Sequence, residues 1–210
     1  VAAAVLSERL TNPQERVFCP GHFTFGNRTY KCWKKEGHGS VDLRDAIKKS
    51  CDVYFYTMGL RLGVDRLADY ARALGLGHLT GIPLPQEKPG LIPTSTWKQR
   101  RFHEKWMAGE TVSIAIGQGY DLVTPLQLVS AYAALANGGR LVKPRLVLAH
   151  RDAQGEVVPE PVTEPRQEIE FPEAALRAVL DGLQAVVEEP GGTGGRARVP
   201  GVHIGGKTGT

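Results

Sequence analysis

The stretch that most constrains the fold is GGKTGT, residues 205–210, which ends a short β-like run beginning at Val202. On the edge of a strand, Lys207 followed by Thr208 and a glycine would place an ammonium, a hydroxyl and an accessible backbone N–H side by side. These groups can hold a carboxylate and stabilise an oxyanion. A glycine-rich turn without chemistry is the alternative. A P-loop is excluded, because the lysine does not follow a G-x-x-x-x-G stretch that leads into a helix.

A second pattern, SCD at residues 50–52, lies at the junction of two predicted helices. Ser50 and Asp52 are two positions apart, so both can project into one cleft from a helix end while Cys51 points away from it. A serine that only caps a helix explains the same residues without chemistry. Taken alone, the pattern leaves both interpretations open.

Together, and in this order, the two patterns resemble the second and third motifs of the serine penicillin-recognising enzymes, whose signature is S-x-x-K, S-D-N and K-T-G. Three further stretches look like the class B penicillin-binding proteins of cell elongation: KKEGHG (34–39), WKQRRF (97–102), and IGQGY (116–120) followed by Thr124 and Pro125. The resemblance covers essentially the whole chain. It implies an α+β transpeptidase fold, with helices packed on an antiparallel sheet, in a single domain over 1–210 that is truncated at both ends.

The resemblance also implies roles for individual residues. Ser50 would relay a proton between the catalytic lysine and the departing amine. Asp52, in place of the more usual asparagine, would position the peptide substrate, and Lys207 would support the proton network electrostatically. Thr208, Gly209 and Thr210 would bind substrate: the two threonines would contact its carboxylate, and the backbone N–H of Thr210 would be one oxyanion-hole donor.

The function that the resemblance implies is a peptidoglycan D,D-transpeptidase, acting on stem peptides that end in D-Ala-D-Ala and acylated by β-lactams. Its domain would lie in the periplasm, anchored in the inner membrane by a segment outside this sequence, and would work beside a membrane glycosyltransferase of the rod-shape elongation machinery. A different class of function stays open, namely a non-catalytic penicillin-recognising sensor or scaffold that binds cell-wall peptides. The sequence immediately before Val1 would distinguish them, because an S-x-x-K there supports the enzyme.

One departure from the family pattern concerns the nucleophile. The single S-x-x-K string runs from Ser95 to Lys98, downstream of SCD rather than upstream, in a proline-punctuated segment. A nucleophile and its base need fixed geometry one helical turn apart. We therefore interpret this string as a decoy and place the true motif just before residue 1, with residues 1–10 as the helix that follows it. The polypeptide as given is then expected to be inactive.

All three cysteines, Cys19, Cys32 and Cys51, fall within 33 residues, and His38 lies among them. Three thiolates and one imidazole form a closed tetrahedral set that structural zinc favours. The sequence therefore predicts a structural Zn²⁺ site whose Cys51 sulfur faces away from the cleft. The alternatives are a Cys19–Cys32 disulfide, which an oxidising compartment favours, and three unlinked thiols.

Composition sets the remaining limits. The formal net charge of +4 is spread along the chain without the interleaved aromatic residues of RNA-binding surfaces, which argues against a nucleic-acid partner. No run of about 18 apolar residues occurs that could span a membrane.

Periodicity and capping predict more helix than strand, with the strands far apart in sequence. Helices are expected over 1–10, 41–49 (capped by Ser40), 53–62, 64–74, 124–137 and 173–188. Short strands are expected within 13–39, a half-buried strand over 111–116, and a hairpin over 141–158 that turns at Gln154 and Gly155. Residues 76–110 are expected to form a long surface excursion, anchored by Trp97, Phe102 and Trp106.

Overall fold

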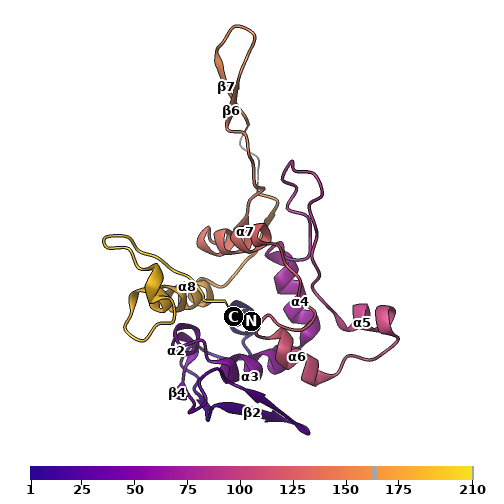
Figure 1. The fold of residues 1–210 in the computed structure, drawn as a ribbon, viewed down its shortest axis with the longest axis vertical. Helices are drawn as coiled ribbons and strands as arrows, with labels where there is room; N and C mark the ends of the chain where they lie inside the picture. Colours follow the sequence, from indigo (N-terminus) through magenta and orange to yellow (C-terminus); the bar gives the residue numbers. More distant parts are fainter. Residues whose placement is uncertain (162–164, 210) are drawn as a thin grey trace. The chain divides into compact units, whose positions relative to one another are not determined.

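The structure, a computed structural model, describes residues 1–161 and 165–209 and has the expected mixed α+β class (Figure 1). The helices are α1 (Ala2–Ser7), α2 (Leu43–Lys48), α3 (Asp52–Leu62), α4 (Val64–Ala73), α5 (Ser95–Phe102), α6 (Ala108–Ile114), α7 (Pro125–Ala136), α8 (Glu173–Glu188) and the 3-10 helix η1 (Gly195–Ala197). The strands are β1 (Val17–Cys19), β2 (His22–Phe25), β3 (Arg28–Lys31), β4 (Gly39–Val41), β5 (Arg140–Leu141), β6 (Ala149–Arg151), β7 (Val157–Pro159) and β8 (Gln167–Glu168). They pair antiparallel as β1–β4, β2–β3, β5–β8 and β6–β7.

The chain divides into two compact units, and the division falls inside α4. The first unit contains residues 1–68, 93–120 and the described residues from Phe171 onward, and the second contains 69–92 and 121–170. The expectation of a single domain over 1–210 stays a prediction. None of the helices in the described part of the chain is long and apolar enough to cross a membrane.

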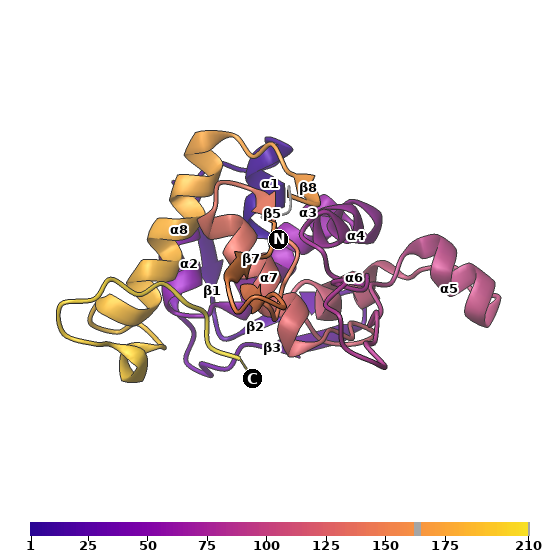
Figure 2. The same cartoon turned by 90° about the horizontal axis from the view of Figure 1, so that it is seen from above.

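The core of the first unit is formed by α2, α3, α6 and α8. Figures 1 and 2 both show α8 alongside α2, and the two helices contact each other. Leu43, Tyr54, Met58, Val112 and Val186 are completely or almost completely buried between these helices and represent the largest apolar side chains of the interior. The helix predicted over 173–188 is confirmed as α8.

Helix α6 replaces the strand that alternation predicted over 111–116, so that prediction was wrong. Glu110 closes the start of the helix by accepting the backbone N–H of Met107, 2.8 Å away. The helix then packs against α3 at Gly59, where an added Cβ would lie 2.3 Å from the Cβ of Ala115. Polar and apolar residues alternate over these six positions, as they would in a strand. The capped start and the close contact with α3 nevertheless stabilise a helix.

Two further expectations need correction. Ser40 lies in β4, and the helix that it was expected to cap begins later, where the Asp42 side chain accepts the N–H of Asp45 at 3.0 Å. The predicted strand from Val202 is also absent among the described residues 202–209, where Val202 makes only an isolated bridge to Val199. A strand needs a neighbour for its ladder of hydrogen bonds, and none of the described strands pairs with this segment.

The second unit contains α7 and two short antiparallel pairs. Thr124 and Gln127 form the capping box at the start of α7, with Pro125 at its first position, as predicted. The predicted hairpin is β6–β7, which turns through Asp152–Gly155 and extends away from α7 (Figure 1). Leu141, which was expected to start this hairpin, instead pairs with Gln167 in β5–β8.

The predicted surface excursion contains a helix, α5, as well as its anchors. The indole of Trp97 packs against Tyr120 with ring centroids 5.1 Å apart, and Phe102 packs against Trp97 at 5.5 Å. The indole N–H of Trp106 donates to Thr111 Oγ1 over 2.9 Å. Trp97 and Trp106 thus attach residues 93–110 to Tyr120 and Thr111, as predicted, whereas Phe102 is 41% exposed.

Candidate functional site

Ser50 lies in the turn that ends α2, and its backbone geometry is unusual. Its φ angle is +54°, in the left-handed region that normally requires glycine. The N–H of Ser50 donates to Ile47 O at 3.2 Å and the N–H of Cys51 to Ala46 O at 2.9 Å. These two bonds define a Schellman motif with serine in the glycine position. The turn points the Ser50 hydroxyl away from the helix at a conformational cost of about 1–2 kcal/mol.

The segment that carries Lys207 lies along α8. The N–H of Gly206 donates to Leu183 O at 3.0 Å, and the N–H of Ile204 donates to Glu188 Oε1 at 2.9 Å. Because α8 also packs against α2, this attachment brings Lys207 to the end of α2. A backbone far from Ser50 in sequence is therefore fixed beside it.

A network of hydrogen bonds joins the two motifs. Lys207 Nζ donates to Ser50 Oγ, and it also lies 3.2 Å from Thr208 O. Ser50 Oγ lies 3.2 Å from Thr193 Oγ1 and 3.3 Å from Thr208 Oγ1, and the two threonine hydroxyls are 2.9 Å apart. Thr193 donates to Lys48 O over 3.4 Å. A donor chain from Lys207 through Ser50 and Thr193 can thus end on a backbone carbonyl.

Burial shifts the pKa values of Lys207 and Asp52, the two charged groups at this network. Burial lowers the pKa of Lys207, and the nearby Asp52 carboxylate opposes that shift. Burial raises the pKa of Asp52 to about 6, against the stabilising backbone N–H of Trp33, which lies 2.9 Å from Asp52 Oδ2. An ammonium with a lowered pKa gives up its proton more readily, so Lys207 and the Ser50 hydroxyl can pass a proton to a substrate atom placed beside them.

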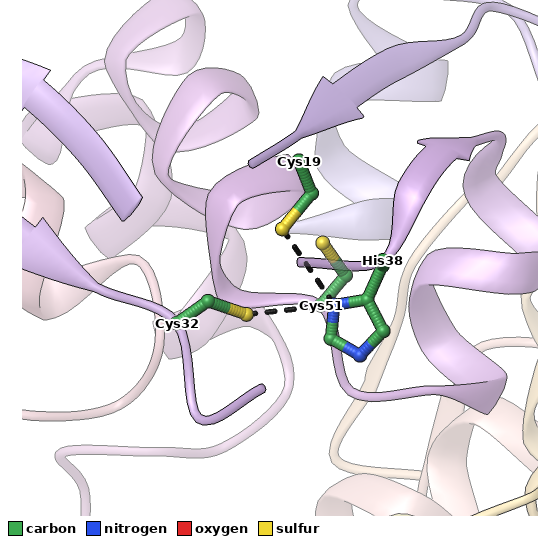
Figure 3. A group of neighbouring side chains, drawn as sticks. All are labelled: Cys19, Cys32, His38 and Cys51. Atoms are coloured by element: carbon green, nitrogen blue, oxygen red, sulfur yellow. Dashed lines mark hydrogen bonds between the residues drawn. The ribbon is translucent and has the colours of Figure 1, made fainter. Parts of the chain in front are cut away.

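Cys19, Cys32, His38 and Cys51 form a compact cluster behind this turn (Figure 3). Their potential ligand atoms all lie within 4.8 Å of one another, and the three cysteines are buried as free thiols. His38 Nδ1 lies 3.6 Å from Cys19 Sγ and 3.5 Å from Cys32 Sγ. A hydrogen bond with the Cys51 thiol lowers the pKa of Cys32, which favours a thiolate ligand.

These distances fit a tetrahedral zinc site. With Zn–S and Zn–N bonds of about 2.3 and 2.05 Å, an S···N edge of the tetrahedron is about 3.6 Å. Nδ1 is the ring nitrogen of His38 that contacts the thiols, whereas Nε2 is buried and makes no hydrogen bond within the described residues. The donor types, their closeness and their burial therefore fit the metal that the sequence predicted.

The backbone brings these four residues together by turns that glycine permits. Cys19 ends β1, and the β2–β3 hairpin returns the chain so that the N–H of Cys32 donates to Gly21 O at 2.9 Å. Gly21 and Gly37 have φ angles of +94° and +81°, and a Cβ on Gly21 would lie 2.0 Å from Lys35 O. Glycine at these two positions therefore permits the bends that bring the cluster together.

The structure brings together most of the residues that the sequence predicted. Ser50, Asp52, Lys207 and Thr208 surround the end of α2, and Gly209 follows as an exposed residue. Thr210 lies outside the described residues.

Cys51 lies in the cluster, consistent with the prediction that its sulfur faces away from Ser50 and Asp52. Ser50 and Cys51 precede α3 rather than lie within it, so the left-handed turn, and not the helical repeat, separates the two side chains.

Sequence reasoning missed Thr193. It lies in the glycine-rich loop PGGTGG, residues 190–195, which periodicity indicates only as a break between elements. The available signal was a single hydroxyl among glycines. A glycine-rich loop lets its backbone approach another segment closely, so the one side chain in it that can hydrogen-bond is a candidate for a contact with that segment. The loop folds back so that the N–H of Thr193 donates to Lys48 O at 3.2 Å.

The S-x-x-K string lies on α5, and its two functional groups are bonded elsewhere. Ser95 Oγ donates to Asp65 Oδ2 at 2.7 Å, and Lys98 Nζ binds both carboxylate oxygens of Glu110 at 2.7 Å. Lys98 is 5% exposed, so this ion pair is largely removed from solvent. The contacts support the decoy interpretation, although the string is helical rather than in a loop.

Comparison with known proteins identifies the fold and the motifs. A family model described as the penicillin binding protein transpeptidase domain matches residues 1–210. The chain belongs to the penicillin-binding-protein transpeptidase family. This membership confirms the resemblance seen in the sequence and the predicted fold class.

The curated relatives of this transpeptidase-family chain include the peptidoglycan D,D-transpeptidase MrdA of Haemophilus influenzae, 38% identical over 214 residues that cover 100% of this chain and 33% of MrdA. MrdA of Acinetobacter baumannii is 39% identical over 199 residues, which cover 91% of this chain and 28% of that protein. The chain thus spans about a third of the length of these relatives.

Solved structures show the same relationship. PBP2 of Pseudomonas aeruginosa in complex with WCK 5153 matches with a TM-score of 0.83 and 33% identity, covering 93% of this chain and 42% of that one. PBP2 of Helicobacter pylori matches with a TM-score of 0.84 and 30% identity, covering 98% and 37%. The complex of PBP2 and MreC from the same organism gives a TM-score of 0.79 and 30% identity, covering 91% and 34%.

Proposed function

We propose that this chain is part of a peptidoglycan D,D-transpeptidase in which Ser50, Asp52 and Lys207 serve the acyl-transfer site. The observation that carries the proposal is the bond from Lys207 Nζ to Ser50 Oγ, which joins two motifs 157 residues apart. The identity to MrdA proteins supports the same reaction. Residues 1–210 form one transpeptidase domain in this proposal, consistent with the extent of the family match.

The reaction requires a nucleophilic serine, which we expect in an S-x-x-K segment preceding this chain in the full-length protein. Its oxygen forms an ester bond with the carbonyl carbon of the penultimate D-Ala, and its proton passes to the neighbouring lysine. The C–N bond to the terminal D-Ala breaks, and that amine receives a proton through the Ser50 hydroxyl. An amine of a stem peptide on a second peptidoglycan strand then attacks the ester carbonyl and forms the new peptide bond. The bond to the serine oxygen breaks, and that oxygen takes up a proton to regenerate the hydroxyl.

The residues described here hold the substrate during these steps. Thr208 is an exposed member of the network, beside Ser50 and Lys207. Its hydroxyl and the ammonium of Lys207 would bind the terminal carboxylate of the stem peptide. Asp52 adjoins the same turn and positions the peptide. We assign the oxyanion donor to the Thr210 backbone by family resemblance.

The test of this proposal is the rate at which the full-length protein is acylated by a fluorescent penicillin. Ser50→Ala and Lys207→Ala should each lower the second-order rate constant about a hundredfold, the usual scale for losing a proton-transfer or electrostatic partner. Lys105→Ala, an exposed lysine outside the network, serves as the matched control. Near-wild-type rates in both site variants, with the fold intact by circular dichroism, would refute the assignment.

We further propose a periplasmic location, with anchoring in the inner membrane by a segment outside this chain, and association with the rod-shape elongation machinery. A solved complex contains PBP2 and MreC, and another similar structure concerns polymerization and crosslinking by a peptidoglycan synthase complex. These relatives support an MreC-like partner and a membrane glycosyltransferase for the full-length protein.

The Cys19, Cys32, His38 and Cys51 cluster is proposed to bind one structural Zn²⁺. Bound zinc would join the four side chains and so cross-link the irregular backbone that carries them. With four protein ligands it would have no open position for substrate. The full-length protein, purified without chelator, should contain about one equivalent of zinc by elemental analysis, and Cys32→Ser should lose most of it. Less than about a tenth of an equivalent, together with a mapped Cys19–Cys32 disulfide, would reject zinc in favour of the disulfide alternative.

A further inference from the structure

Trp33 connects the cysteine cluster to the turn at residues 49–52, called the catalytic turn below. It directly follows Cys32, and its indole ring packs edge-on against His38 with centroids 5.4 Å apart. Its backbone N–H donates to Asp52 Oδ2 at 2.9 Å. Its indole N–H donates to two carbonyls, Lys49 O at 3.0 Å and Ser50 O at 2.9 Å. One residue therefore contacts a cluster ligand and both polar residues of the SCD motif.

The carbonyls that Trp33 binds are the ones that need a partner. The last carbonyls of a helix accept no hydrogen bond from the helix itself. A side-chain donor that binds them therefore fixes the orientation of the final peptide groups. At the end of α2 these peptide groups belong to Lys49 and to Ser50, which occupies the left-handed conformation. A strained conformation persists only where the surroundings hold it, and the indole N–H supplies such a restraint.

Core packing does not explain this tryptophan, because its side chain contributes little to the interior: Trp33 is 58% exposed. The contacts it makes are instead polar and directed, through its two N–H groups. The segment that carries it is short and bounded by two members of the cluster, Cys32 and His38. Holding these two members together fixes the loop between them.

We propose that Trp33 is a positioning residue that couples metal binding at the cluster to the geometry of Ser50 and Asp52. The proposal rests on the proposed transpeptidase function of the same site. When the metal is bound, the 32–38 loop is held, and the donors of Trp33 hold the turn and the Asp52 carboxylate. When the metal is removed, the loop is released and these restraints on the two catalytic residues weaken together.

The first experiment measures acylation of the full-length protein by a fluorescent penicillin, before and after zinc removal with a chelator. Trp33→Phe keeps an aromatic ring but removes the indole donor, and it should lower the rate about tenfold, the equivalent of one good hydrogen bond. Its zinc content should match the wild type, and circular dichroism should show that it is folded. Zinc removal should lower the wild-type rate about tenfold but the Trp33→Phe rate much less, since both changes remove the same restraint.

The matched control is Phe18→Leu. Phe18 is an exposed aromatic residue that adjoins the cluster ligand Cys19, just as Trp33 adjoins Cys32. It lies in β1, and within the described part of the chain no hydrogen bond joins its side chain to residues 49–52. This variant should keep both the wild-type rate and the full response to zinc removal. An equal response of Trp33→Phe and the wild type to zinc removal would overturn the proposal.

A second measurement does not depend on acylation. Zinc removal should change the tryptophan emission of the wild type, and zinc readdition should restore it, whereas Trp33→Phe should lack this component. A full emission change in Trp33→Phe, or none in the zinc-loaded wild type, would contradict the coupling. If Ser50→Ala and Lys207→Ala acylate normally, the proposed function fails, and the emission experiment still decides whether Trp33 reports on the metal.

Discussion

At the scale of single residues, Thr193 is the side chain that adds most to the motifs. Its hydroxyl lies between those of Ser50 and Thr208 and donates to Lys48 O. Thr193 has one hydroxyl hydrogen, so when it donates to Lys48 O its oxygen is left to accept from Ser50 or Thr208. In that arrangement the threonine gives the Ser50 hydroxyl an acceptor within the network.

We therefore predict that Thr193→Val slows acylation of the full-length protein about tenfold, the cost of one hydrogen bond to a positioned hydroxyl. Valine has nearly the shape of threonine without the oxygen, so the loop should keep its fold. Thr193→Ser keeps the hydroxyl and should stay near the wild-type rate. Equal rates for Thr193→Val and Thr193→Ser would show that the hydroxyl has no role in the network.

Sequence reasoning succeeded for residues in recognisable patterns and failed for those defined by the fold. Ser50 and Lys207 could be predicted because their neighbours form motifs, and the cluster because every cysteine belongs to it. Thr193 and Trp33 act through backbone carbonyls, Lys48 O for one and Ser50 O for the other. Such partners carry no side-chain signature, so only the folded backbone reveals them.

At the scale of elements, the junction of α2 and α8 positions both halves of the site. Arg44 Nε lies 2.6 Å from Asp181 Oδ2, and its guanidinium also binds the Glu189 carboxylate. Lys48 Nζ lies 2.7 Å from Glu189 Oε2. Hydrogen bonds from Arg44 and Lys48 lower the pKa of Glu189 to about 2. Ser50 follows one helix and Thr193 the other, so this carboxylate helps to hold them together.

A pH dependence follows from the depressed pKa of Glu189. Its folded-state pKa of about 2 is below its ordinary value of 4.5, so its contribution to stability is present above about pH 4.5 and is lost as the pH falls towards 2. Glu189→Gln should destabilise the full-length protein at pH 7, and the difference from the wild type should shrink by pH 3. Urea denaturation at the two pH values measures this, and a constant difference would contradict the ion-pair account.

Among the elements, α7 and α8 were predictable from local sequence, and α6 was not. The start of α7 is set by Thr124 and Pro125, and α8 by a regular apolar face, so local sequence determines both. Helix α6 is 7 residues long and depends on its contact with α3 at Gly59, which periodicity over so short a window cannot reveal. Tertiary contact therefore decided this element.

At the scale of the whole molecule, the chain contains the second and third motifs of its family and spans about a third of its relatives. Its one S-x-x-K string has its serine bonded to Asp65 and its lysine to Glu110. The lysine is thus a paired cation rather than a base for Ser95. Fold class and family were predictable from the sequence because the motifs are specific in combination, whereas the division into two units was not.

We predict that the 210-residue polypeptide incubated with penicillin stays unmodified by intact-mass spectrometry, because the paired Lys98 cannot activate Ser95. The full-length protein under the same conditions should gain one penicilloyl adduct. Circular dichroism of the polypeptide establishes that it is folded during the incubation. A stoichiometric adduct mapped to Ser95 would reverse the interpretation of that string.

The left-handed backbone at Ser50 has a consequence for how this protein tolerates genetic change. Glycine at position 50 would relieve the turn of its strain, since that conformation suits a residue without Cβ. Drift that is filtered only for folding would therefore tend to install glycine there and remove the hydroxyl that Lys207 contacts. Retaining serine therefore requires selection on what that hydroxyl does, and a library sorted for solubility alone would enrich well-folded proteins that lack it.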